Sequence, residues 1–92
     1  MSFLEELDNI IKQRKIDLPE QSYTTTLFKQ GDDRILRKVS EEAGEFIIAV
    51  KNKDITELKN EAADLLFHVM VALRNQGVGI DDVINILKER HK

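Results

Sequence analysis

Residues 32–75 read DDRILRKVSEEAGEFIIAVKNKDITELKNEAADLLFHVMVALRN, and this stretch decides the fold. Apolar residues recur in it at intervals of three and four, which is the spacing of one face of an α-helix. The pattern predicts one helix from residue 32 or 33 to about 51 and a second from about 54 to 75. A turn centred near Lys53 makes the two helices an antiparallel hairpin.

Helix-capping signals mark the ends of both expected helices. Asp32 or Asp33 is the expected N-cap of the first helix, and Asn52 is its expected C-cap. Asp54 and Glu57 form a capping box for the second helix. The turn between the helices is therefore short.

Four carboxylates lie at matching heights on this hairpin. Glu45 and Glu61 stand eight residues either side of Lys53, while Glu42 and Asp64 stand eleven either side. Glu42 also falls inside the apolar stripe of its helix. Because like charges repel and burial adds to the cost, such a group is stable mainly around a cation. All-oxygen ligation favours Mg²⁺, with Mn²⁺ as an alternative, over Zn²⁺.

Other polar side chains border the same stripe. Lys38 and Arg34 could hold phosphate groups, although simple surface ion pairs explain them equally well. His68 lies on an apolar border, where a histidine is more often a buried residue bonded to a neighbour than a ligand. It could also contact a substrate or support a ligand.

The composition of the chain argues against several classes of protein. The chain has 92 residues, which predicts a single domain over residues 1–92, and its net charge of -3 argues against nucleic-acid binding through a basic face. The absence of cysteine excludes disulfides and thiolate metal sites. The acidic N-terminal segment does not fit a signal peptide, and the longest apolar run, residues 65–73, is too short to cross a bilayer. We therefore expect a cytoplasmic protein without a membrane partner.

The rest of the chain also reads as helical, so the predicted fold class is all-α. We expect helices over about residues 2–14, 22–30 and 81–92, separated by proline or glycine, with Ser2 and Glu5 as a capping box for the first of them and Asp81 as the N-cap of the last. The helix ending at residue 75 carries Phe67, Met70 and Val71 on its far side, so it is apolar nearly all round. A small monomer cannot cover such a helix, which predicts a homodimer, or a higher oligomer, sharing a helical bundle.

The acidic pattern resembles that of the all-helical nucleoside triphosphate pyrophosphohydrolases of the MazG type. It stands here as Glu41-Glu42-Ala43-Gly44-Glu45 followed by Glu61-Ala62-Ala63-Asp64. Within that group, Ser22-Tyr23-Thr24 and Leu65-Leu66-Phe67-His68 look most like the phosphoribosyl-ATP pyrophosphatase family. The resemblance covers nearly the whole chain. One departure is Ser40, where that family usually has glycine.

This resemblance implies hydrolysis of phosphoribosyl-ATP, a small-molecule nucleotide, to phosphoribosyl-AMP and pyrophosphate, the second step of histidine biosynthesis. The metal ligands that it implies are Glu42, Glu45, Glu61 and Asp64. Glu41, the most exposed of the carboxylates, is expected to act through a water molecule, as a base or an outer-shell ligand. The residues expected to contact the substrate are Arg34, Lys38, Ser22, Tyr23, Thr24 and His68.

Two other functions remain open at this point. A sister enzyme of the same superfamily, such as a house-cleaning dNTP pyrophosphatase, would share the acidic pattern. A helical carboxylate di-iron protein, or a non-catalytic interaction module with solvated acidic faces, would use it differently. The di-iron class needs Glu-x-x-His pairs, and the residue three before His68 is Leu65, which counts against that class.

Overall fold

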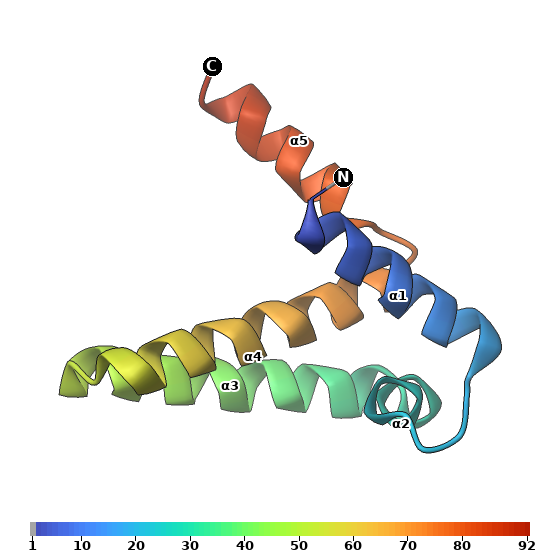
Figure 1. Ribbon diagram of the computed structural model, residues 1–92, viewed down its shortest axis with the longest axis horizontal. Coiled ribbons are helices and arrows are strands. Elements are labelled where there is room, and N and C mark those ends of the chain that lie inside the picture. The colour runs from blue at the N-terminus through green and yellow to red at the C-terminus, as the bar shows by residue number, and fades with distance from the viewer. Residues whose placement is uncertain (1) are drawn as a thin grey trace.

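The computed structural model describes residues 2–92, which form five helices and no strand. They are α1 (Phe3–Asp17), α2 (Tyr23–Gln30), α3 (Asp32–Asn52), α4 (Ile55–Asn75) and α5 (Ile80–Arg90). Figure 1 shows α3 and α4 side by side as a long antiparallel hairpin, with α1 and α2 at the end remote from the turn and α5 pointing away. The all-α prediction and the helix hairpin are confirmed. None of the described helices is both long and apolar enough to span a membrane.

Two of the predicted N-caps are confirmed. The Ser2 hydroxyl accepts a hydrogen bond from the Glu5 amide at 3.2 Å, and the Asp54 carboxylate accepts one from the Glu57 amide at 3.1 Å. Each bond satisfies one of the free N–H groups in the first helical turn. Helix α1 continues to Asp17, three residues beyond the predicted end.

The expected cap at the start of α3 is wrong. Gly31, at φ 85°, is the N-cap of α3 and supplies no side chain. The Asp32 carboxylate instead accepts hydrogen bonds from the side-chain amides of Asn75, at 2.6 Å, and Gln76, at 3.0 Å. This pair of contacts ties the beginning of α3 to the end of α4, a use of Asp32 that helix-capping rules do not anticipate.

The expected caps at two other helix ends are also wrong. Lys53 ends α3 in the left-handed conformation, at φ 56°, where Asn52 was expected to be the cap. Helix α5 begins after Gly79 rather than at Asp81, and the Asp82 carboxylate accepts a hydrogen bond from the Gly79 amide at 3.0 Å. In both cases the cap lies within two residues of the predicted position.

The core lies at the end of the hairpin remote from its turn. Its fully buried side chains come from all five helices and are Ile11, Leu27, Ile35, Met70, Val71 and Ile80. The burial of Met70 and Val71 within one chain corrects the expectation that they form a core shared by two subunits, because α1 and α2 cover this side of α4. Phe67 is partly buried against the same cluster.

A buried ion pair joins the helices around this core. Arg74 donates two hydrogen bonds to the Asp8 carboxylate, from Nε at 2.9 Å and from Nη2 at 2.6 Å, and the Ile80 amide donates a third at 3.1 Å. Burial raises the pKa of Asp8, but these donors outweigh it and hold that pKa below its ordinary value. A Cβ on Gly79 would lie 2.8 Å from Arg74 Nη2, so a larger residue there would push the guanidinium away from its position beside Asp8. One carboxylate therefore fixes α1, α4 and the start of α5.

We expect Asp8→Asn to lower the free energy of unfolding by about 3 kcal/mol, because it leaves the Arg74 guanidinium without its charged partner in a largely buried site. Urea unfolding followed by circular dichroism measures the change. Glu89→Gln is the matched control, since the Glu89–Lys92 pair is short, at 2.8 Å, but exposed. It should change stability by less than about 0.5 kcal/mol. Equal effects of the two substitutions would contradict the assignment.

Candidate metal centre

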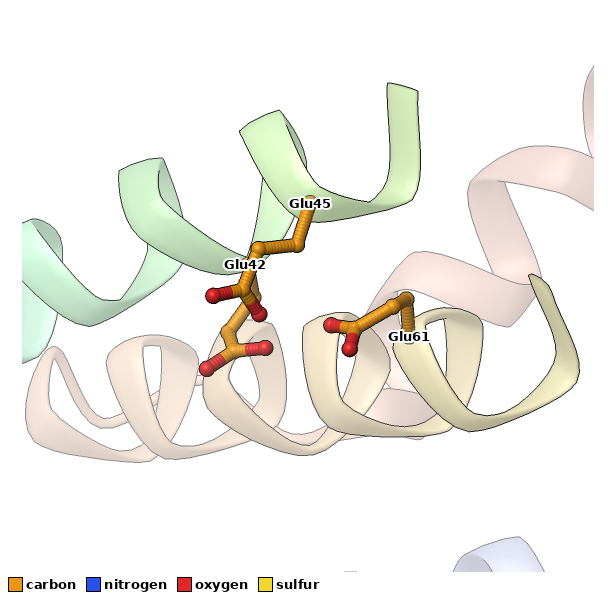
Figure 2. Close-up of side chains that lie close together, drawn as sticks. All are labelled: Glu42, Glu45 and Glu61. Atoms are coloured by element: carbon orange, nitrogen blue, oxygen red, sulfur yellow. The ribbon is translucent and has the colours of Figure 1, made fainter. Parts of the chain in front are cut away.

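Three carboxylates meet midway along the hairpin. Glu42 and Glu45 project from successive turns of α3, and Glu61 projects toward them from α4, as Figure 2 shows. One oxygen from each of the three lies within 4.8 Å of the others. We call Glu42, Glu45 and Glu61 the acidic triad. Residues three apart lie on neighbouring turns of one face, and the short turn near Lys53 brings the second helix back to the same level.

The triad is partly buried as well as crowded, since Glu42 is buried, Glu61 is half-buried and Glu45 is exposed. Glu42 is only 7% exposed, and among the described residues no partner reaches the buried Oε2 atoms of Glu42 and Glu61. Burial, followed by the hydrogen bonds to Glu45 and Glu42, raises the pKa of Glu61 to about 7. Burial also raises the pKa of Glu42, but hydrogen bonds from Glu61 and Lys38 outweigh it, so the net shift is downward. Glu61 is therefore the carboxyl that holds a proton in the metal-free protein below about pH 7.

Lys38 supplies positive charge beside the triad. Its ammonium nitrogen lies 3.4 Å from Glu42 Oε1 and 3.4 Å from Glu41 Oε2. Burial lowers the pKa of Lys38, but its interactions with Tyr23, Glu41 and Glu42 outweigh burial and raise it. Lys38 is thus charged at neutral pH and faces both an acidic ligand candidate and the exposed Glu41.

The acidic triad could hold a metal ion. It offers oxygen donors only, converging from two helices, and two of these oxygens are buried without a partner. Oxygen-only donor sets suit hard divalent ions such as Mg²⁺ and Mn²⁺. A bound dication would supply the charge that a proton on Glu61 and the Lys38 ammonium supply in part.

Asp64, the fourth predicted ligand, lies outside the triad. It is exposed, and its oxygens are not among those that lie within 4.8 Å of one another. Glu41 is also exposed and lies outside the triad, on the solvent side of Lys38. The structure thus brings together three of the four predicted ligands, and the roles of Asp64 and Glu41 stay predictions.

Two of the predicted substrate residues form a hydrogen-bonded chain beside Lys38. The Tyr23 hydroxyl lies 2.7 Å from His68 Nε2, and His68 Nδ1 lies 2.7 Å from the Asp64 carbonyl oxygen. Since a carbonyl oxygen can only accept, Nδ1 carries the proton and Nε2 accepts from the Tyr23 hydroxyl. His68 is 5% exposed, and both its nitrogens are occupied, which matches a buried histidine bonded to its neighbours rather than a metal ligand.

The remaining predicted substrate residues are placed less directly. The Ser22 hydroxyl caps α2 by accepting from the Thr25 amide at 3.2 Å, and it also accepts from the Arg14 guanidinium at 3.2 Å. Thr24 is buried. Arg34 is half-buried and stands one turn before Lys38 on the same side of α3. Ser22 therefore holds α2 in place, which in turn positions Tyr23.

Comparison with known proteins identifies the family. A family model described as phosphoribosyl-ATP pyrophosphohydrolase matches residues 4–91. A protein of Leptospira biflexa named phosphoribosyl-ATP pyrophosphatase is 47% identical over 91 residues, covering 99% of both chains. The chain belongs to the phosphoribosyl-ATP pyrophosphohydrolase family. The earlier resemblance to this family is thereby confirmed.

Other relatives of this family member are longer proteins. The histidine biosynthesis bifunctional protein HisIE of Bacillus subtilis is 54% identical over 88 residues, which are 96% of this chain and 42% of that protein. The corresponding protein of Halalkalibacterium halodurans is 51% identical over 86 residues, 41% of its length. The chain thus spans about two-fifths of the length of these bifunctional relatives and nearly all of the Leptospira protein.

The structure of this family member also shows a feature that sequence reasoning missed. A cavity of about 330 Å³ opens beside Glu45 and Glu61, on the side of the hairpin turn. Ile48, Asn52 and Glu57 line it. Helix capping was the only role expected of Asn52 and Glu57. Asn52 lies four residues after Ile48, and Glu57 lies three residues after Asp54. This spacing, which places two residues on one side of a helix, was the available signal for the lining of the cavity.

We expect the stability of the metal-free protein to fall as pH rises from about 4.5 to about 7. Glu61 keeps its proton up to about pH 7 in the folded state but loses it near pH 4.5 in the unfolded state. Between these two pH values the folded state binds the extra proton, so the free energy of unfolding falls as the pH rises. Melting temperatures in a chelator at pH 4.5, 5.5 and 7.5 measure the effect.

Glu61→Gln should remove much of this pH dependence, whereas Glu20→Gln, at an exposed position outside the triad, should leave it unchanged. Saturating Mg²⁺ should raise the melting temperature of the wild type most at pH 7.5, where the cation no longer competes with the proton. A wild-type melting temperature that rises across the window relative to Glu61→Gln would contradict the shift.

Proposed function

We propose that this chain hydrolyses phosphoribosyl-ATP to phosphoribosyl-AMP and pyrophosphate, the reaction of histidine biosynthesis from which its family takes its name. The observation that carries the proposal is the acidic triad: residues that match the family's acidic pattern converge at one partly buried place, next to a charged lysine. A cytoplasmic location, with no nucleic-acid partner, belongs to the same proposal.

In this proposal Glu42, Glu45 and Glu61 hold one Mg²⁺, and Asp64 joins them after a change of side-chain rotamer. A bound Mg²⁺ would neutralise charge on the phosphates and acidify a bound water. The protein's own contribution is to fix the oxygen donors before the ion arrives. The i, i+3 spacing on α3 and the buried position of Glu42 do this, since a buried side chain has few rotamers left to lose.

Glu41 is the proposed base for the attacking water. It is exposed, so it can exchange a proton with solvent, and its carboxylate lies 3.4 Å from the Lys38 ammonium. Lys38 and Arg34 are the proposed contacts to the phosphates, because both carry permanent positive charge on one side of the triad. When a polyphosphate approaches, Lys38 can turn from Glu42 toward it.

We propose that the part of the substrate site next to Lys38 is formed by Tyr23, Thr24 and His68. The Tyr23 hydroxyl donates to His68, so its oxygen lone pairs are left free to accept from a ligand or from Lys38. His68 acts by holding Tyr23, and Ser22 acts by capping α2. Tyr23 also stacks near Phe67, with ring centroids 6.4 Å apart, which restricts its movement.

We expect Glu42→Gln to reduce turnover of phosphoribosyl-ATP at saturating Mg²⁺ by at least about 100-fold, because loss of a ligand should exceed the effect of losing a residue that only supports one. Pyrophosphate release measures the rate. Circular dichroism should stay almost unchanged, and Glu5→Gln, which is on α1 away from the triad, should keep the wild-type rate. A Glu42→Gln protein with near wild-type turnover would contradict the ligand assignment.

The same assay separates the proposed function from its nearest rival. Pyrophosphate release from phosphoribosyl-ATP is compared with release from ATP, dUTP and dCTP at equal Mg²⁺. The proposal expects the highest kcat/KM for phosphoribosyl-ATP. A higher value for a deoxynucleotide would favour the house-cleaning pyrophosphatase, and no turnover of any of them with Mg²⁺ or Mn²⁺ would favour a non-catalytic interaction module.

We also propose that the chain forms a homodimer through the apolar side of the hairpin. Figure 1 shows that no other helix covers the turn half of α3 and α4. Toward the other end of the hairpin, a cavity of about 280 Å³ lies between the two helices, lined by Leu36, Val39, Val69, Ala72 and Leu73 among others. Leu36 and Lys38 lie about 160° apart around α3, so this side faces away from the acidic triad. A second hairpin packed there would complete a four-helix bundle.

Sedimentation equilibrium at low micromolar concentration should therefore show a dimer. Leu36→Lys should weaken it by at least about tenfold, because a charge would be buried at the contact. Ile86→Lys is the matched control: Leu36 is 56% exposed and Ile86 51% exposed in the single chain, but Ile86 lies on α5 away from the hairpin. A wild-type monomer, or equal effects of the two substitutions, would refute this interface.

A further inference from the structure

The cavity beside the acidic triad differs in chemistry from the surface on the other side of the triad. It holds about 330 Å³, within the range of small-molecule sites. Ile48 and Ala49 give it an apolar wall, and Asn52 and Glu57 give it polar groups. Glu45 and Glu61 belong to both the cavity and the triad, so a ligand in the cavity would adjoin an ion held by the triad.

Along one side of α3, the side chains change from basic to acidic and then to uncharged. Arg34 and Lys38 come first, then Glu42 and Glu45, and then Ile48 and Asn52. At about 1.5 Å per residue, Arg34 and Lys38 lie roughly 12 Å and roughly 6 Å before Glu42, and Asn52 lies roughly 15 Å after it. The triad therefore lies between a positively charged region near α2 and the cavity near the turn, which is lined by uncharged and acidic side chains.

Charge decides which part of a nucleotide fits each region. A polyphosphate in the cavity would face Glu57 as well as the triad carboxylates, and the cavity lining includes no Lys or Arg. Its like charges would be repelled there and attracted beside Lys38 and Arg34. A sugar and base would bind more favourably in the cavity. Their hydroxyl and amino groups can donate to the carboxylates and to the Asn52 amide oxygen, and a flat ring can pack on Ile48 and Ala49.

We infer that the cavity at the hairpin turn binds the ribonucleoside part of the substrate, with the polyphosphate extending across the acidic triad toward Lys38. This orientation deepens the proposed function and rests on it. It makes Ile48, Asn52 and Glu57 substrate-contacting residues, none of which the acidic pattern singles out. The unpartnered Oε2 of Glu61 lies where these two parts of the substrate would join, and Glu42, more than nine-tenths buried, has a second one.

Two probes test the two halves separately on the full chain with Mg²⁺: AMP for the nucleoside side and pyrophosphate for the polyphosphate side. Calorimetry measures their dissociation constants. The variant Ile48→Ala/Asn52→Ala should weaken AMP binding by at least about tenfold, because it removes an apolar contact and a hydrogen-bonding group. It should change pyrophosphate binding by less than about twofold.

Two matched variants complete the experiment. Ile86→Ala removes a similarly exposed isoleucine from α5 and should leave AMP binding unchanged. Lys38→Gln should weaken pyrophosphate at least as strongly as it weakens AMP, since it removes positive charge from the opposite side. Ile48 and Asn52 are both exposed, so circular dichroism of the double variant should match that of the wild type.

The inference is overturned if wild type does not bind AMP, if the double variant binds AMP normally, or if it loses pyrophosphate instead. These outcomes are distinct from failure of the proposed function, which is measured as turnover of phosphoribosyl-ATP by wild type. Turnover with unchanged AMP binding in the double variant would leave the reaction standing and reject the cavity. Selective loss of AMP binding without turnover by wild type would support the cavity and reject the reaction.

Discussion

Repulsion among Glu42, Glu45 and Glu61 is the constraint around which the rest of the structure is arranged. Three carboxylates within 4.8 Å of one another, one of them almost fully buried, are unfavourable unless positive charge enters the group. In the metal-free protein a proton on Glu61 and the Lys38 ammonium supply that charge. Both can be displaced, the proton by a cation and Lys38 by rotation toward a phosphate, so the site is ready for a metal-bound anion.

Such a site needs a rigid support, and the opposite end of the molecule provides it. The Asp8–Arg74 pair, the Ile80 amide and the close approach of Gly79 hold α1, α4 and the start of α5 together. The contacts of Asp32 with Asn75 and Gln76 fix the start of α3 to the end of α4. With its far end fixed in this way, the hairpin can leave parts of both of its sides exposed without losing its register.

These two exposed sides have opposite chemistry, which gives them separate uses. One carries the acidic triad, with cations toward α2 and the cavity toward the turn. The other carries Leu36, Val39 and Val69 around an apolar cavity. A 92-residue chain has too little material to cover a long hairpin on every side. Binding of substrate on the side with the acidic triad, and of a second copy of the chain on the apolar side, is consistent with this exposure.

The helices, the hairpin and the acidic triad could be predicted from the sequence, because each depends on local periodicity. Spacings of three and four set the faces of a helix, and a short turn sets the height at which two helices meet, so Glu42, Glu45 and Glu61 could be placed together from position alone. Only the tertiary structure decided which neighbours a side chain meets across long separations. Asp8 and Arg74 are 66 residues apart, and Tyr23 and His68 are 45 apart, with no repeating pattern to join them. Asp32 bonds across to Asn75 instead of capping its own helix, and α1 covers Met70 and Val71 within one chain, because packing of the whole chain outweighs these local preferences.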